Sequence, residues 1–144
     1  MRHMVLGLLV VKLAAGCATP PSRVELPVFP PGEDGVAIVA VRPTPPARLQ
    51  PGDRMEFDLV YQLSSTERAT LYVRPYTDGR QSRNYIGHAP IECETGYRKV
   101  DAWISFRSSA AIDEIRVMLI GAERRELLAV ATNQVEAVWE IVGE

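Results

Sequence analysis

The sequence predicts an all-β fold, an antiparallel β-sandwich of about seven strands over residues 36–144. Three observations support this prediction. Apolar and polar residues alternate in several short segments, as they do in strands with one buried and one solvated face. Turn-forming pairs, such as Pro51-Gly52 and Asp78-Gly79, separate these segments. The chain has 144 residues, of which 47% are hydrophobic and 24% charged, and this composition suits one globular domain with a packed core.

The clearest predicted strand covers residues 55–63, where apolar residues alternate with mostly polar ones. One face is expected to lie in the core and the other, which includes Val60, to be largely solvated. A short apolar strand is expected before it at Val36–Val41, and another strand after it at Ala69–Arg74. The predicted core face of the 55–63 strand consists of Met55, Phe57, Leu59, Tyr61 and Leu63.

Three further strands are predicted toward the C-terminus, at Val100–Arg107, Glu114–Ile120 and Val135–Val142. Residues 122–131 are ambiguous, because their propensities permit a helical turn or two, although a hairpin followed by a strand is favoured. Trp103 lies opposite the apolar face of its strand, so either both faces are partly covered or Trp103 marks an exposed contact patch. The expected core residues of these strands are Ala102, Ile104, Phe106, Ile115, Val117, Leu119, Val135, Ala137, Trp139 and Ile141.

Two stretches carry a resemblance to a known class of domain. Residues 48–63, RLQPGDRMEFDLVYQL, place a Pro-Gly turn before an alternating strand and resemble the early strands of immunoglobulin-like and fibronectin type III-like domains. Residues 135–142, VEAVWEIV, are similar to the last strand of those domains. The resemblance implies an immunoglobulin-like β-sandwich without the paired cysteines of antibody domains.

Residues 1–16 have the layout of a secretory signal peptide, with a basic start, an apolar run at residues 4–11 and small residues before Cys17. The run is much shorter than the roughly 20 residues that span a bilayer as a helix. The pentad LAAGC, residues 13–17, resembles the lipobox of bacterial lipoproteins. This resemblance implies that Cys17 is acylated and becomes the first residue of the mature chain. An ordinary cleaved signal peptide and a buried first strand or helix are the alternatives.

Residues 17–35 are predicted to form a proline-rich linker between the lipid anchor and the domain, because proline favours extended, semi-rigid chain. The alternative is that Val24–Phe29 pairs with the domain as an edge strand. Ala18 would follow the acylated cysteine. In lipoproteins of two-membrane bacteria an aspartate at that position favours the inner membrane, so the resemblance implies an outer-membrane location in such a host.

Composition and motifs also limit the chemistry. A net charge of −2 provides no broad attraction to nucleic acid. The sequence lacks a Gly-x-Ser-x-Gly elbow, a phosphate-binding loop, a Cys-x-x-Cys pair and a His-Glu-x-x-His motif, so no enzymatic activity, metal or cofactor other than the lipid is expected. Cys93 is expected to be a buried apolar group or an exposed thiol; without acylation of Cys17, a disulfide between the two becomes possible.

The segment 74–99 is the candidate recognition region, because it gathers aromatic and arginine side chains where the alternation fades. Such side chains frequently anchor interfaces, and loops often carry binding surfaces. The alternative is a solvated crossover with one edge strand at residues 84–91. The candidate recognition residues are Tyr76, Arg80, Arg83, Tyr85, His88, Tyr97 and Arg98.

Together, these patterns predict a lipid-anchored cell-envelope protein that binds or positions another envelope component, either a protein or an envelope polymer, without catalysis. One alternative is an accessory subunit of a secretion, pilus or export machine. A second alternative is an envelope enzyme that uses carboxylates such as Asp78, Glu92 or Glu94 together with His88.

Overall fold

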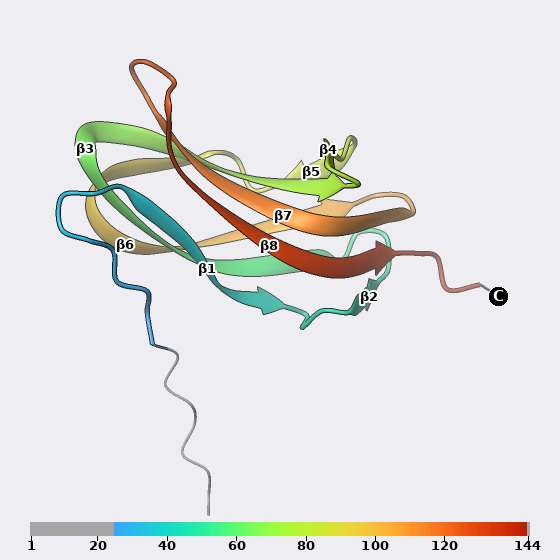
Figure 1. Cartoon of the computed structure of the whole chain (residues 1–144). Helices are drawn as coiled ribbons and strands as arrows, with labels where there is room; N and C mark the ends of the chain where they lie inside the picture. Colours follow the sequence, from blue (N-terminus) through green and yellow to red (C-terminus); the bar gives the residue numbers. More distant parts are fainter. Residues whose placement is uncertain (1–24, 144) are drawn as a thin grey trace, which may run out of the picture.

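The computed structural model describes residues 25–143, and its eight strands form one continuous sheet that folds over into two layers. The predicted all-β, mainly antiparallel sandwich is confirmed, with one more strand than the approximate number expected. Figure 1 shows the long strands β3 and β6 curving at one end of the molecule. The strands are β1 (Gly35–Arg42), β2 (Ala47–Leu49), β3 (Arg54–Thr77), β4 (Arg80–Gln81), β5 (Tyr85–Gly87), β6 (Ile91–Phe106), β7 (Ala110–Gly121) and β8 (Leu127–Trp139).

The strands predicted at residues 55–63 and 69–74 are two halves of the single strand β3. The first half pairs with β1 and with the C-terminal half of β6, whereas the second half pairs with β7 and with the N-terminal end of β6. The register between β3 and β6 shifts between Leu63 and Arg68, where β3 bends. One strand therefore passes from one layer to the other, as strands do at the corners of β-sandwiches.

The first layer consists of β1, the first half of β3, the C-terminal half of β6 and the short strand β5. The second layer consists of the second half of β3 with β7, β8 and β2. The β2–β8 pairing is parallel, and the other strand pairs are antiparallel. The two layers are thus connected both by the bend of β3 and by the chain that runs from β1 in one layer to β2 in the other.

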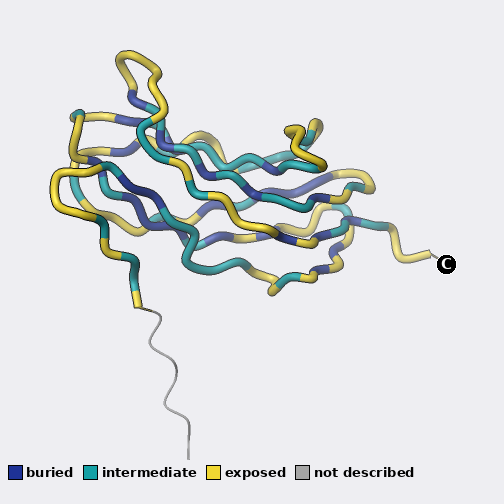
Figure 2. The backbone as a smooth tube through the Cα atoms, viewed as in Figure 1, coloured by how far each residue is buried: buried dark blue, intermediate teal, exposed yellow. Residues whose placement is uncertain are grey.

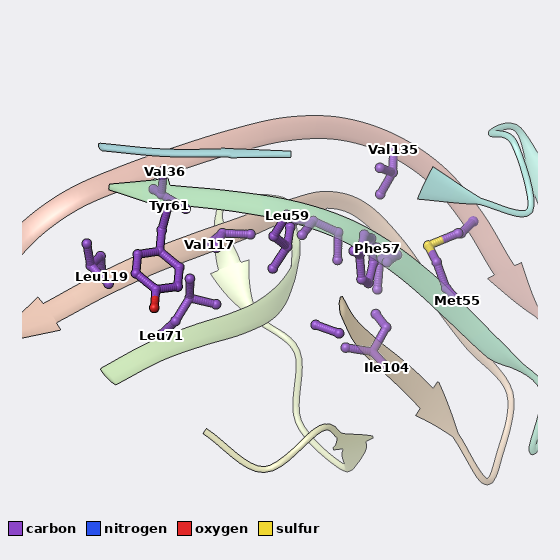
Figure 3. Close-up of a cluster of buried hydrophobic side chains, with 14 of the residues drawn as sticks. Val36, Met55, Phe57, Leu59, Tyr61, Leu71, Ile104, Val117, Leu119 and Val135 are labelled. Carbon is purple, nitrogen blue, oxygen red and sulfur yellow. The ribbon is translucent and has the colours of Figure 1, made fainter. Parts of the chain in front are cut away.

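The hydrophobic core lies between the layers (Figure 3), and most of the predicted core positions are confirmed. Every predicted core residue of the 55–63 strand is at most 2% exposed. Trp139 packs on Phe106 with their ring centroids 4.8 Å apart, and its indole Nε1 donates a hydrogen bond to the carbonyl oxygen of Asp53 at 3.0 Å. Because this polar group is satisfied, the largest core side chain is buried without an unpaired donor.

The C-terminal region differs from the prediction at one point. Residues 122–131 form a turn and the start of β8, so the favoured hairpin and strand is confirmed and the helical alternative is wrong. The strand predicted over residues 135–142 ends at Trp139, and Ile141, expected in the core, is 75% exposed. The alternation continues past the strand in the sequence, but β2 pairs only as far as Trp139 and offers no ladder beyond it.

The N-terminal segment, residues 25–34, lies against the first layer and contains no strand, so the alternative of an edge strand is wrong for residues 25–29. The Tyr97 hydroxyl donates a hydrogen bond to the Pro27 carbonyl oxygen at 2.6 Å, and the rings of Phe29 and Tyr97 are 6.2 Å apart. Leu26 lies beside Val60 in a surface hollow of the first layer. Val60 is only 1% exposed and is the exception on a face that is otherwise solvated as expected, since Glu56 is exposed and Asp58 and Gln62 are half-buried.

The N-terminal segment also supports the bend of β3. The carboxylate Oδ1 of Asp34 accepts hydrogen bonds from the backbone N–H groups of Ser64 and Ser65, at 2.7 and 3.0 Å, and the Ser65 hydroxyl donates to Oδ2. Partial burial raises the pKa of the Asp34 carboxyl, but these hydrogen bonds outweigh it and hold the pKa below its ordinary value. The charged carboxylate therefore stabilises the interval in which the β3–β6 ladder is out of register.

Candidate binding site

The candidate recognition region is not one irregular loop, which corrects the prediction for residues 74–99. β6 begins at Ile91 and continues through this stretch to Phe106. In its first half, Cys93 is the buried residue, and Gly96 has a φ of 125° that interrupts the regular strand. Because few side chains there face the core, the strand shows little apolar alternation and resembles a loop in the sequence.

The structure divides six of the seven candidate recognition residues between two places. One set surrounds the β3–β4 hairpin and the start of β5, and consists of Tyr76, Arg80, Arg83 and Tyr85. The Asp78-Gly79 turn of this hairpin has φ values of 51° and 75°, as the turn prediction required. Tyr97 and Arg98 lie in the middle of β6, about nine residues from the position that pairs with β5, hence on the order of 30 Å away along the strand.

His88 and the candidate catalytic carboxylates are also separated. The His88 backbone N–H donates to the Trp103 carbonyl oxygen at 2.9 Å, and its side chain lines a hollow of about 180 Å³ in the first layer. Glu92 and Glu94 line a different hollow, of about 270 Å³. Within residues 25–143, no group of three His, Cys, Asp or Glu side chains is arranged to hold a metal ion.

Cys93 is a buried residue rather than an exposed thiol. It is 1% exposed, and its sulfur lies 3.6 Å from the Ile91 carbonyl oxygen. Burial raises the pKa of the Cys93 thiol to about 11, although a hydrogen bond with Tyr61 acts in the opposite direction. The thiol is therefore protonated at neutral pH and packs as a small apolar group. Cys17 and the predicted signal peptide, residues 1–16, lie outside the described residues.

The outer face of the first layer is charged. The Arg42 guanidinium donates two hydrogen bonds to Asp58, at 2.7 and 2.8 Å, and its Nε lies 3.7 Å from Glu56. The hydrogen bonds from Arg42 hold the pKa of the Asp58 carboxyl below its ordinary value, against the opposing effect of burial. Arg54 stacks on the half-buried Trp103 ring, with 3.8 Å between the guanidinium carbon and the ring centroid. Trp103 is thus partly covered, which is the first of the two predicted alternatives.

The outer face of the second layer carries the strongest candidate binding surface, which the sequence analysis missed. On this face, Tyr72 of β3 lies beside Met118 of β7, and Met118 lies beside Val130 of β8. The neighbouring row of outward-facing residues places Ile120 beside Leu127. Leu127 is 57% exposed and Val130 is 51% exposed, while the other three are half-buried. We call these five residues the apolar patch.

An arginine and tyrosine border lies beside the apolar patch on the same outer face. In the two rows of outward-facing residues that follow Tyr72 along β3, Arg74 lies beside Arg116 and Tyr76 lies beside Glu114. The guanidinium carbon of Arg116 is 3.9 Å from the Tyr76 ring centroid, and that of Arg74 is 4.9 Å from the Tyr72 ring centroid. Glu114 forms an ion pair with Arg116, whereas no ion pair of Arg74 exists within residues 25–143. The border therefore retains the positive charge of Arg74.

A sequence signal for the apolar patch does exist in the strand predicted at residues 114–120. Met118 and Ile120 occupy the face opposite the core residues of that strand, so the strand is apolar on both faces over its second half. A strand of this kind is covered on both sides in a packed sheet or leaves an apolar surface exposed.

Comparisons with known proteins do not assign the chain to a family. No protein-family model matches the chain, and no curated protein matches it. Among solved structures, it is similar to one described as the crystal structure of the periplasmic chaperone SfaE, with 12% sequence identity and a TM-score of 0.40. The similarity covers 76% of this chain and 59% of that chain, which is less than two thirds of its length. In the part that the structure describes, no helix is long and apolar enough to cross a membrane.

Proposed function

We propose that this chain is a lipid-anchored, non-catalytic protein of the bacterial cell envelope whose sandwich binds another envelope protein through the apolar patch. The observation that carries the binding role is the exposure of Leu127 and Val130 beside Tyr72, Met118 and Ile120 on the outer face of the second layer. Contiguous exposed apolar side chains with a polar border are typical of protein interaction sites.

The border indicates the chemistry of the partner. Arginine and tyrosine are enriched among the residues that dominate binding free energies, because they combine large contact area with directional polar groups. Arg74 contributes a guanidinium without an ion pair in the described chain, next to the apolar patch. The expected partner surface therefore has an apolar centre and a carboxylate that reaches Arg74 at its edge.

The anchor and the location rest on the N-terminal sequence. The pentad at residues 13–17 supports acylation of Cys17 after export, and Ala18 supports an outer-membrane destination in a two-membrane host. Leu26 and Pro27 contact the first layer, so the part of the predicted linker 17–35 that can separate the domain from the lipid ends before Leu26. The domain would then stay close to the membrane surface to which the lipid is attached.

Crosslinking in living cells tests the binding role. A photo-crosslinking amino acid is placed at Val130 in the full-length chain, and the matched control places it at the exposed Ser108, in the β6–β7 turn. We expect a discrete crosslinked envelope protein at position 130 that is absent at 108 and is lost when Arg74→Glu is added. Equal products at both positions, or none at position 130, would contradict the binding role.

Metabolic labelling tests the anchor separately. Cells that express the wild-type chain are grown with a clickable fatty acid, and the Cys17→Ser variant is the control. We expect label on the wild type and none on the variant. Absence of label on the wild type, or label that survives Cys17→Ser, would contradict the anchor without affecting the crosslinking result.

A further inference from the structure

The outer edge of β6, opposite its ladder with β3, has no strand partner over most of its length. β5 pairs only with residues 104–106, so residues 91–103 have no strand on that edge within the described chain. Figure 2 shows a run of exposed residues where β6 curves at the end of the molecule. The edge of β8 is less open, because β1 lies beside it and residues 44–45 share a hollow with residues 133–134.

One hydrogen bond shows which backbone groups point to this edge of β6. His88 follows β5 on that side, and its N–H donates to the Trp103 carbonyl oxygen at 2.9 Å. In an antiparallel sheet, alternate residues direct both of their backbone groups to the same side. The β3–β6 ladder has no register shift over residues 96–105, so Lys99 and Asp101 direct their N–H and C=O groups to the outer edge. No backbone hydrogen bond to these groups occurs there within residues 25–143.

Lys99 and Asp101 also carry opposite charges that are left without an ion pair in the described chain. Both side chains are exposed, and the register places them on the outer face of the first layer. Lys99 lies beside the apolar Val60, and Asp101 lies beside Asp58, whose carboxylate is already bonded to Arg42. Asp101 therefore faces a like charge and lacks a cation of its own.

We propose that two copies of this chain associate by antiparallel pairing of their β6 edges about a two-fold axis at Val100. This register places Lys99 of each copy opposite Asp101 of the other, and the backbone groups of both residues point toward each other. A lysine on an edge strand normally prevents pairing, but an aspartate two residues further along makes this edge complementary to itself. An axis at Lys99 would place two lysines opposite each other, and an axis at Asp101 two aspartates. The charges therefore favour one register, which gives a closed dimer.

The neighbouring structure limits the ladder to residues 98–102, an ordinary strand length. His88 occupies the edge at Trp103, and Gly96, with a φ of 125°, interrupts the strand on the other side. The two-fold axis of such a pair is perpendicular to the sheet, so the outer faces of both first layers lie on the same side. Both N-terminal segments then lead to one membrane, as the proposed anchors on Cys17 require. The apolar patches lie on the second layers and remain free.

Charge reversal at the two positions tests the proposal. In a dimer of Lys99→Asp, carboxylates face each other across the axis, and in a dimer of Asp101→Lys, ammonium groups do. When the two variants are mixed, every carboxylate instead faces an ammonium group of the other chain. Both side chains are exposed, so neither reversal should prevent folding. The matched controls are Arg107→Asp and Glu123→Lys, at exposed positions outside this edge.

The purified full-length chain in detergent is studied by sedimentation over a range of concentrations. We expect a reversible monomer–dimer equilibrium that each of the two variants weakens about tenfold or more, that their mixture restores, and that the controls leave unchanged. Restoration in the mixture also shows that both variants are folded. A monomer at every concentration, a dimer insensitive to either variant, or a mixture that associates no more strongly than its components would overturn the proposal. A dimer abolished by Arg74→Glu would place the contact at the apolar patch and would also overturn it.

Discussion

The two outer faces of the sandwich both include residues of β3, yet they differ in charge and in how far their apolar side chains are exposed. The face of the first layer is charged, with Arg42 bonded to Asp58, and Leu26 of the N-terminal segment lies beside Val60, which is fully buried there. The face of the second layer carries the apolar patch and has no such cover, since Val130 is 51% exposed. One face is covered by the chain itself, and the other is the face at which we propose that a partner binds.

The connectivity explains this difference. Residues 25–34 lead directly into β1, which is the edge of the first layer, so they reach the neighbouring face of β3 and β6 without a long connection. After β8, the chain has only a few described residues, and Ile141 and Val142 are exposed rather than folded back. The described chain therefore supplies a cover for one face and none for the other, and we expect binding at the uncovered face.

The largest expected effect comes from placing the same charge on both faces. Val60→Asp buries a carboxylate under the N-terminal segment and should lower the free energy of unfolding by about 2 kcal/mol. Val130→Asp leaves its carboxylate in solvent and should change stability by less than about 0.5 kcal/mol. Chemical denaturation of the two variants measures the difference. Similar decreases in the free energy of unfolding at both positions would show that Val130 is also covered, which would contradict the proposed difference between the two faces.

A smaller effect is expected from the Asp34 carboxylate, which joins the N-terminal segment to the bend of β3. Asp34→Ala should cost about 1 kcal/mol, because two backbone N–H groups and the Ser65 hydroxyl lose their acceptor. Asp34→Asn retains one acceptor oxygen and should cost less. Denaturation midpoints of both variants at neutral pH provide the measurement, and equal stability of wild type and Asp34→Ala would contradict this role.

The same carboxylate predicts a pH dependence with a definite sign. The pKa of Asp34 is lower in the folded protein than its ordinary value, so its stabilising effect is present above about pH 4, near the unfolded pKa, and is lost as the pH falls toward the folded pKa. The difference in stability between wild type and Asp34→Asn should therefore shrink on acidification below pH 4. Because both proteins retain Asp58, the comparison cancels the similar acid dependence of that group.

The contrast between the faces was only partly predictable from the sequence. Period-two alternation identified the buried stripes of β3, β7 and β8, because those residues face a continuous core. It did not identify the single curved strand from Arg54 to Thr77, since Ser64-Ser65 in the middle has the composition of a turn. The partners that hold this bend, above all Asp34, lie about thirty residues away in the sequence and act through tertiary contacts.

The candidate site was harder to predict than the fold for a related reason. The segment 74–99 is rich in aromatic and arginine residues, but the structure distributes them along β3, β4, β5 and β6. The apolar patch forms only when β3, β7 and β8 align Tyr72, Met118 and Val130 in one row. Register between strands that are distant in sequence depends on the whole sheet, so no single segment contained this information.

A further variant, Tyr97→Phe, tests the attachment of the N-terminal segment alone. Tyr97→Phe removes the hydroxyl that donates to the Pro27 carbonyl oxygen at 2.6 Å, and should cost about 0.5–1 kcal/mol. Amide hydrogen exchange should increase in residues 25–34 while the core strands remain protected. The matched control is Tyr72→Phe on the second face, where Arg74 stacks on the ring rather than on the hydroxyl. Unchanged exchange in Tyr97→Phe would mean that other contacts hold the segment.

The smallest expected effect tests whether the two outer faces differ because the N-terminal segment covers one of them or because an arginine stacks on an aromatic ring there. Both faces contain an arginine above an aromatic ring, Arg54 over Trp103 in the first layer and Arg74 over Tyr72 in the second. Arg54→Met and Arg74→Met should each change the free energy of unfolding by only about 0.5 kcal/mol, because exposed cation–π pairs contribute little. Thermal denaturation compares the two variants. If the stacking of Arg54 on Trp103 stabilised the first face, Arg54→Met would instead lower the free energy of unfolding nearly as much as Val60→Asp. The burial of that face would then depend on Trp103 rather than on the N-terminal segment.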